Sequence, residues 1–188
     1  MRVTPQATTP RPRTLIHPGQ TVATRIVHRH CKKGRHIRLS LKPGASMFDA
    51  LIGPLQELGI QSASTTILGG ELERLSYCVA PPDASGQAVI CYTAPMDAGQ
   101  TSFIFGNATI GKDAKGRPIV HCHAAFRTAS GAVKGGHIIT QDTVIGDQPI
   151  TVLVTAFNEF DLQVAYDPET NISLIQPRPA AALKGAWV

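Results

Sequence analysis

The chain has 188 residues, of which 43% are hydrophobic and 16% are charged, as in an ordinary globular protein. This length and composition are typical of one domain that buries its own core. They exclude a membrane-spanning protein, because no apolar run approaches the roughly 20 residues of a membrane span. The net charge of +5 suits an anionic partner better than a cationic one.

The positive charge is concentrated in the first part of the chain. Ten Lys and Arg residues precede Asp49, the first acidic residue, whereas the remainder has eight basic and thirteen acidic residues. We therefore predict that residues 1–34 form a basic, Pro-rich arm outside the compact domain. Such an arm attracts nucleic acid largely through counterion release, although it could also be a solvated tail that aids solubility. The candidate nucleic-acid contacts are Arg11, Arg13, Arg25, Arg29, Lys32, Lys33 and Arg35.

A compact domain is predicted over residues 35–176, and it begins with a strand and a helix. Residues 36–41 alternate between apolar and polar, which predicts a half-buried strand. Ser46 suits a helix N-cap, with Asp49 three residues on and apolar residues at helical spacing after it. Pro54 is expected to kink or shorten this helix, and Gly59 to end it.

After the helix, the hydrophobic period becomes that of strands, and the elements are short. Turn signals such as Gly69-Gly70 separate them. The expected strands are residues 63–68, 72–80, 87–92, 102–110, 118–127, 133–139, 150–157, 162–166 and 172–176. This pattern predicts an α+β single domain, with a mainly antiparallel β-sheet packed by one main helix. Residues 177–188 are predicted to be a C-terminal tail.

The four cysteines have no CxxC spacing, and the start of the chain has no apolar secretory segment. We therefore expect free, buried thiols in a reducing compartment, and a cytoplasmic protein.

Three histidines follow one another closely in the second half of the chain. His121 and His123 lie two residues apart in an expected strand and therefore share a face. If residues 129–131 form a hairpin loop with Gly131 at positive φ, Arg127 pairs with Val133 and His123 lies directly opposite His137. The three rings could then share one metal ion with a fourth position open, as in zinc sites. The alternative is a pair of strands whose histidines are only solvated or bonded to the backbone.

Several motifs together resemble the plants-and-prokaryotes-conserved (PPC) domain family. They are Leu39–Gly44 before the helix, Gly59–Ala63 after it, His121-Cys122-His123, Gly135-Gly136-His137 and the turn Asp167–Asn171. The resemblance implies a central antiparallel sheet and a homotrimer. It also implies metal binding by the three histidines near a subunit boundary, as in bacterial members, and DNA association, as in plant members with an AT-hook. Lys115–Pro118 contains a Gly-Arg-Pro core but lies in an expected turn, so it is not an AT-hook.

We therefore predict a DNA-binding or regulatory PPC-domain protein with a three-histidine metal site. The metal is Zn²⁺ or another divalent transition metal, held by His121, His123 and His137. The predicted partners are two further copies of the chain, as a homotrimer, and DNA through the arm. The alternative is a metal-dependent enzyme or small-molecule sensor that uses the same histidines, with Asp142 or Glu159 as candidates for proton transfer.

Overall fold

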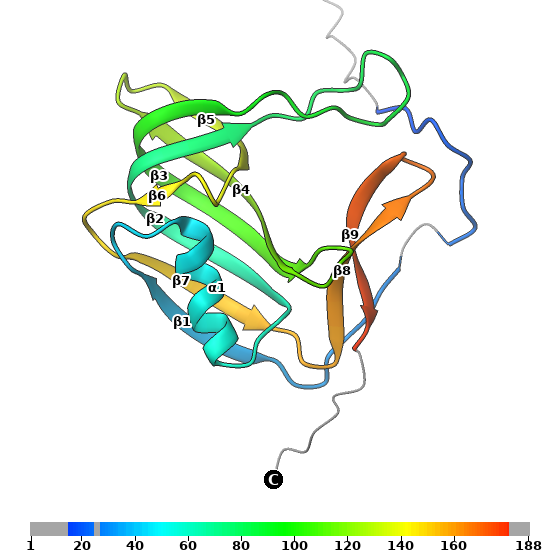
Figure 1. The fold of residues 1–188 in the computed structure, drawn as a ribbon, viewed down its shortest axis with the longest axis horizontal. Helices are drawn as coiled ribbons and strands as arrows, with labels where there is room; N and C mark the ends of the chain where they lie inside the picture. Colours follow the sequence, from blue (N-terminus) through cyan, green and yellow to red (C-terminus); the bar gives the residue numbers. More distant parts are fainter. Residues whose placement is uncertain (1–14, 25–26, 181–188) are drawn as a thin grey trace, which may run out of the picture.

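The computed structural model describes residues 15–24 and 27–180 of the chain. In this part it contains one helix, α1 (Met47–Glu57), and a sheet of nine strands (Figure 1). The strands are β1 (Arg35–Leu41), β2 (Ala63–Cys78), β3 (Met96–Lys112), β4 (Pro118–Thr128), β5 (Val133–Ile138), β6 (Val144–Ile145), β7 (Ile150–Ala156), β8 (Phe160–Asp167) and β9 (Ile172–Pro179).

The strands pair almost entirely in antiparallel fashion. Their order is β1-β7-β2-β5-β4-β3-β8-β9, and β6 pairs with β2. The single parallel contact joins Lys112 of β3 to Gln163 of β8. A mainly antiparallel sheet with one helix confirms the predicted fold class.

The long strand β2 closes four strands into a ring. Its first half pairs with both β3 and β7, and its end pairs with β5 at Tyr77↔Ile138 and Cys78↔His137. Because β3 also pairs with β4, and β4 with β5, the pairings run from β2 through β3, β4 and β5 back to β2. This closure brings the end of β2 beside the third histidine.

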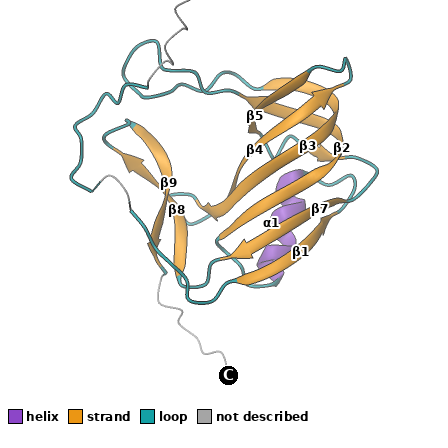
Figure 2. Ribbon diagram, turned by 180° about the vertical axis from the view of Figure 1, so that it is seen from behind, coloured by secondary structure: helices purple, strands orange, loops and turns teal. Residues whose placement is uncertain are grey.

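Helix α1 covers one face of the sheet, and the core lies between them. The Ser46 hydroxyl accepts a hydrogen bond from the Asp49 amide at 3.0 Å, as predicted for the N-cap. Leu51 and Leu55 of the helix are fully buried, as are Ile67 and Val152 of the sheet. Pro54 lies inside the helix, which nevertheless continues to Glu57. Figure 2 shows the sheet from the other side, with α1 behind it.

The strand predicted over residues 87–92 is wrong. This segment is an irregular loop with one isolated bridge, Pro82↔Ile90. Its backbone donors bond elsewhere: the Gln87 and Ala88 amides donate to the Asp83 carboxylate, and the Val89 amide donates to the Thr170 carbonyl. The Asp83 carboxylate and a carbonyl of the β8–β9 turn have therefore replaced the ladder of a strand.

The turn predicted at Gly69-Gly70 is also wrong, because β2 runs through both residues without interruption. These glycines allow other groups to approach closely. A Cβ on Gly69 would lie 2.9 Å from the Phe103 carbonyl oxygen, and one on Gly70 would lie 2.6 Å from the Ile150 side chain. The two glycines are thus needed for close packing within a strand. The sequence pattern alone does not distinguish such glycines from those of a turn.

The segment before residue 24 contacts the turn between β8 and β9. The His17 ring nitrogen Nδ1 lies 2.7 Å from the Glu169 carboxylate, whose side chain is only 6% exposed. The Val22 amide donates to the same carboxylate at 3.2 Å, and the Gly19 amide donates to the Glu169 carbonyl at 2.9 Å. We call these three contacts the Glu169 clasp. Part of the predicted arm is thus bound to the domain.

The cysteines and the membrane prediction can be compared with the structure. All four cysteines are free, but only Cys78 and Cys122 are buried, whereas Cys91 is exposed. Among the described residues, no helix combines the length and apolar character that crossing a membrane requires.

Candidate metal centre

Strand β4 places the first two histidines on the face of the sheet opposite α1. His121 pairs with Thr109 of β3, and His123 pairs with Asn107. Cys122, between them, points into the core and is fully buried. The side chains of β4 therefore alternate as the sequence predicts, with the two histidines on one face of the sheet and the core residue Cys122 on the other.

The hairpin between β4 and β5 brings in the third histidine in the predicted register. Arg127 pairs with Val133, and His123 lies opposite His137. Gly131 has φ +86° in the connecting loop, and the Thr128 amide donates to the Ala132 carbonyl at 2.9 Å. Only glycine adopts such a φ readily, so this residue sets the loop and with it the register.

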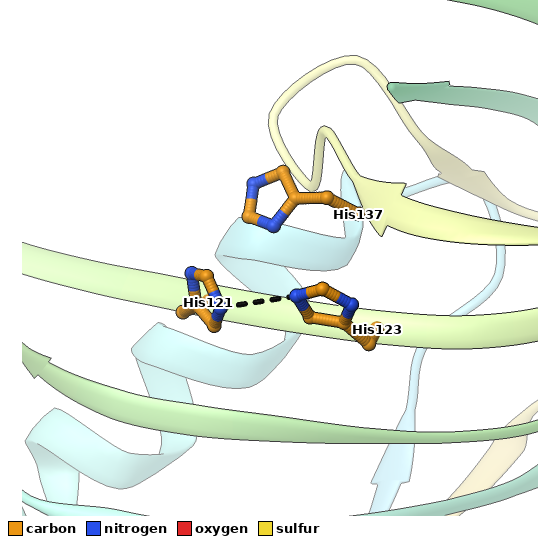
Figure 3. A group of neighbouring side chains, drawn as sticks. All are labelled: His121, His123 and His137. Atoms are coloured by element: carbon orange, nitrogen blue, oxygen red, sulfur yellow. Dashed lines mark hydrogen bonds between the residues drawn. The ribbon is translucent and has the colours of Figure 1, made fainter. Parts of the chain in front are cut away.

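The three rings converge on one point (Figure 3). Their centroids lie 4.9 Å apart for His121 and His123, 4.7 Å for His121 and His137, and 5.3 Å for His123 and His137. The Nε2 atoms of His121 and His123 are 3.1 Å apart. One ring nitrogen from each residue can be chosen so that all three lie within 4.8 Å of one another.

The surroundings keep two of these rings neutral. Burial, and then the neighbouring His121 and His123, together lower the pKa of His137 to about 4. Burial, and then the neighbouring His123, lower the pKa of His121 below its usual value. Neutral imidazole is the form that donates a lone pair to a metal, so no proton has to leave these two rings near neutral pH.

The residues present fit a divalent transition metal. The His137 Nδ1 atom is buried and has no hydrogen-bond partner in the part of the chain that the structure describes. Buried polar atoms in native proteins nearly always have partners, and a bound ion would provide one. Imidazole nitrogens suit zinc, copper, iron and nickel better than magnesium or calcium, which prefer oxygen.

The histidines form part of the wall of an open hollow of about 1300 Å³. The β8–β9 hairpin and the loop between β2 and β3 supply the other walls, chiefly with apolar side chains. Among the described residues that line the hollow, none is Asp, Glu, Lys or Arg. The predicted proton-transfer candidates Asp142 and Glu159 are not among them.

Sequence reasoning missed two residues beside the histidines. Cys78 pairs with His137 across β2 and β5, and the Tyr92 ring lies 5.4 Å from the His137 ring. Both residues line the hollow, and burial raises the pKa of each. Tyr92 comes from the loop mistaken for a strand, and Cys78 reaches the site only through the closure of the ring. Neither has a signal in the local sequence.

The candidate nucleic-acid contacts that the structure describes lie outside this hollow. Arg29, Lys32, Lys33 and Arg35 are exposed, whereas Arg11, Arg13 and Arg25 lie outside the described residues. The Arg35 guanidinium donates to the Leu58 carbonyl at 2.9 Å, at the end of α1. The Gly-Arg-Pro core at residues 116–118 begins in the tight turn between β3 and β4, as expected, where Gly116 has φ +83°.

Most of the chain matches a known family. The Plants and Prokaryotes Conserved (PCC) domain matches residues 28–158, which is more than half of the chain. The chain belongs to this family. The PCC domain is the same family as the plants-and-prokaryotes-conserved (PPC) domain that the sequence resembles. The resemblance is therefore confirmed. No curated protein matches the PCC-domain chain significantly.

Solved structures share the fold of this PCC-domain chain. A plant- and prokaryote-conserved (PPC) protein from Pyrococcus horikoshii superposes with a TM-score of 0.62 at 15% identity, over 80% of this chain and 97% of that one. A "Putative DNA-binding protein" from Ralstonia eutropha JMP134 gives 0.60 at 18%, over 74% and 89%. A "Metal-containing Protein" from Archaeoglobus fulgidus gives 0.57 at 17%, over 80% and 98%.

Proposed function

We propose that this PCC-domain protein binds a divalent transition metal, of which zinc is the best candidate, through His121, His123 and His137. The observation that carries the proposal is the convergence of three imidazoles from adjacent strands, with ligand atoms within 4.8 Å of one another. A metal held by three protein ligands keeps a fourth position open and acts there as a Lewis acid. The metal-containing neighbour of the same fold supports this assignment.

Elemental analysis of the purified full-length protein tests the metal site. We expect about one metal ion per chain for the wild type and a loss of most of it in His123→Ala, because two ligands remain. His36→Ala is the matched control, since His36 is exposed on β1, where its ring Nδ1 lies 3.2 Å from the Thr155 hydroxyl oxygen. Full metal content in His123→Ala would contradict the ligand assignment.

We further propose that the protein is a DNA-associated regulator in the cytoplasm, whose basic arm contacts phosphates. The concentration of Lys and Arg before Asp49 supports this role, as do neighbours described as DNA-binding. Arg29, Lys32 and Lys33 are exposed, and Arg11, Arg13, Arg25 and Arg35 complete the proposed contact set. Such contacts carry little sequence preference and weaken steeply with salt.

A titration with duplex DNA at several salt concentrations tests the arm. Replacing Arg29, Lys32 and Lys33 by Ala is expected to reduce the slope of log K against log[salt] by about 2 to 3, because each lost phosphate contact removes roughly 0.9. An unchanged slope would contradict the proposal.

A matched control removes the same charges elsewhere on the surface. Lys115, Arg127 and Lys134 are exposed and lie in the connections and strands around β4, away from the arm in sequence. Their replacement by Ala removes one Arg and two Lys, as in the arm variant. It is expected to leave the slope at the wild-type value, so an equal reduction would assign DNA binding to overall charge.

The homotrimer is part of the same proposal. The face of the sheet opposite α1 exposes large apolar side chains, among them Phe105 at 50% and Leu153 at 45%. Contact between subunits would cover such side chains. Light scattering of the purified protein is expected to give three times the 20.0 kDa chain mass, and a monomer would contradict it.

A second candidate function is a metal-dependent enzyme or a small-molecule sensor. The observation that favours it is the hollow of about 1300 Å³ beside the histidines, since small-molecule sites are concave and mostly apolar. This candidate uses the same three histidines, so it shares the metal test above.

A further inference from the structure

The charge around the histidines indicates what the hollow can bind. Three neutral imidazoles leave the charge of a divalent ion uncompensated, and the described residues lining the hollow include no carboxylate. A net charge of +2 beside apolar walls is unfavourable, because these walls provide no counter-charge to stabilise it. An anionic ligand at the open position would compensate part of it.

The walls indicate the remainder of that ligand. The β8–β9 hairpin contributes Leu162, Val164, Ile172, Leu174 and Ile175, and the loop before β3 contributes Ile90. A hydrocarbon body along these side chains would remove apolar surface from water on both partners. The hollow is larger than most small-molecule pockets, so a chain or ring system has room beside the histidines.

We propose that the hollow binds an amphipathic monocarboxylate, with its carboxylate on the metal and its hydrocarbon body against the β8–β9 hairpin. This inference rests on the metal site proposed above and adds the class of ligand that this site takes.

Other ligand classes fit the lining less well. A phosphate or a nucleotide would need Lys or Arg side chains or a helix N-terminus, and the described lining has neither charged residues nor a helix. A sugar would need many hydrogen-bonding partners, but the polar side-chain groups of the described lining, apart from the histidines, are the Cys78 thiol and a few hydroxyls, among them Tyr92 and Thr109. A cationic ligand would be repelled by the metal.

Calorimetric titration of the full-length protein loaded with Co²⁺ tests this inference, with visible absorption as a second readout. The probes are acetate, octanoate and octylammonium near neutral pH. Octanoate is expected to bind at least about 100-fold more tightly than acetate, since each buried methylene contributes roughly fourfold. Both carboxylates are expected to change the Co²⁺ spectrum, whereas octylammonium is not. Protein stripped of metal is expected to bind octanoate at least about tenfold more weakly than loaded protein, because the carboxylate loses its charge partner.

The outcomes separate the ligand class from the metal site. If the protein takes up no Co²⁺, the metal site and this inference both fail. If Co²⁺ binds but octanoate binds no more tightly than acetate, the metal site stands and the amphipathic ligand is wrong. The same holds if another copy of the chain fills the hollow, because octanoate then leaves the Co²⁺ spectrum unchanged in an oligomer that light scattering detects.

Two leucine variants locate the hydrocarbon body. Leu174 lines the hollow and is 37% exposed, and Leu58 is 39% exposed at the end of α1, which packs on the other face of the sheet. Leu174→Glu is expected to weaken octanoate at least tenfold while acetate affinity and Co²⁺ content stay within twofold. Leu58→Glu is expected to change neither. Equal octanoate affinity in both variants would overturn the placement.

Discussion

The two faces of the sheet are made from alternate residues of the same strands, yet they have opposite properties. On β4, Cys122 is fully buried against the core, while His121 and His123 point to the hollow on the other side. The helix-covered face is mainly apolar, and no helix in the described chain covers the histidine face. Strand alternation thus separates stability from ligand binding, and a substitution on one face should leave the other property unchanged.

The largest expected effect is on the helix-covered face. Phe126 is fully buried on β4, and its ring contacts Tyr77 edge to face at a centroid distance of 4.9 Å. Phe126→Ala is expected to lower the free energy of unfolding by about 3 to 5 kcal/mol, because a cavity replaces the ring. Urea denaturation measures this loss. The folded fraction is expected to keep its metal, so metal loss from folded Phe126→Ala protein would show that the faces are coupled.

At Gly136, a single substitution is expected to affect both the stability of the fold and metal binding. A Cβ on this residue would lie 2.6 Å from the Cys78 carbonyl oxygen, where β5 meets β2. Gly136→Ala is therefore expected to cost about 1 to 3 kcal/mol through overpacking, and also to weaken metal binding by displacing His137. Urea denaturation and metal titration measure the two effects.

Gly53 provides the control for this substitution. It lies inside α1, and an added Cβ there would meet nothing within 4 Å. Gly53→Ala is expected to stabilise the protein by roughly 0.5 to 1 kcal/mol, because alanine loses less entropy in a helix. If Gly136→Ala behaved in the same way, the close approach of β5 to β2 would be disproved.

Acid is expected to lower the free energy of unfolding through the histidines of the candidate metal site. The pKa of His137 is lowered to about 4 and that of His121 is lowered from 6.5, so both rings bind fewer protons in the folded chain than in the unfolded one. Their contribution is complete above pH 6.5 and is lost as the pH falls toward 4. Urea denaturation of metal-free protein across this window is expected to show a steeper loss for the wild type than for His137→Gln. Equal slopes would contradict it.

The smallest expected loss of stability is at the N-terminus of α1. The Ser46 hydroxyl accepts the Asp49 amide and donates to the Asp49 carboxylate at 2.7 Å. Ser46→Ala is expected to cost about 1 kcal/mol, because a helix N–H loses its partner. Thermal denaturation measures the loss, and metal affinity is expected to stay at the wild-type value. A cost above that of Gly136→Ala would invert the proposed ranking.

The sequence predicted what depends on local periodicity. The N-cap at Ser46, the shared face of His121 and His123, and the register that sets His123 opposite His137 all follow from neighbouring residues and one glycine turn. These features carry the candidate metal site. The two histidine motifs are also among the motifs on which the family resemblance rests.

The remainder depends on contacts between distant segments. The loop over residues 87–92 has strand-forming residues, but Asp83 and the β8–β9 turn take its amides. Gly69-Gly70 reads as a turn because the sequence does not reveal that other groups approach β2 there. The hollow needs the β8–β9 hairpin to stand opposite the histidines, and no local pattern encodes that placement.

The Glu169 clasp determines how the chain can be shortened. It joins His17, Gly19 and Val22 to the turn of the hairpin that lines the hollow, about 150 residues away in sequence. A deletion of residues 1–34 would thus remove seven of the ten Lys and Arg residues that precede Asp49, together with the contacts that hold one wall of the hollow. Removal of residues 1–14 keeps the Glu169 clasp. Of the basic residues, it removes only the first three arginines. Comparison of the two truncations therefore distinguishes a loss of charge from a loosened wall.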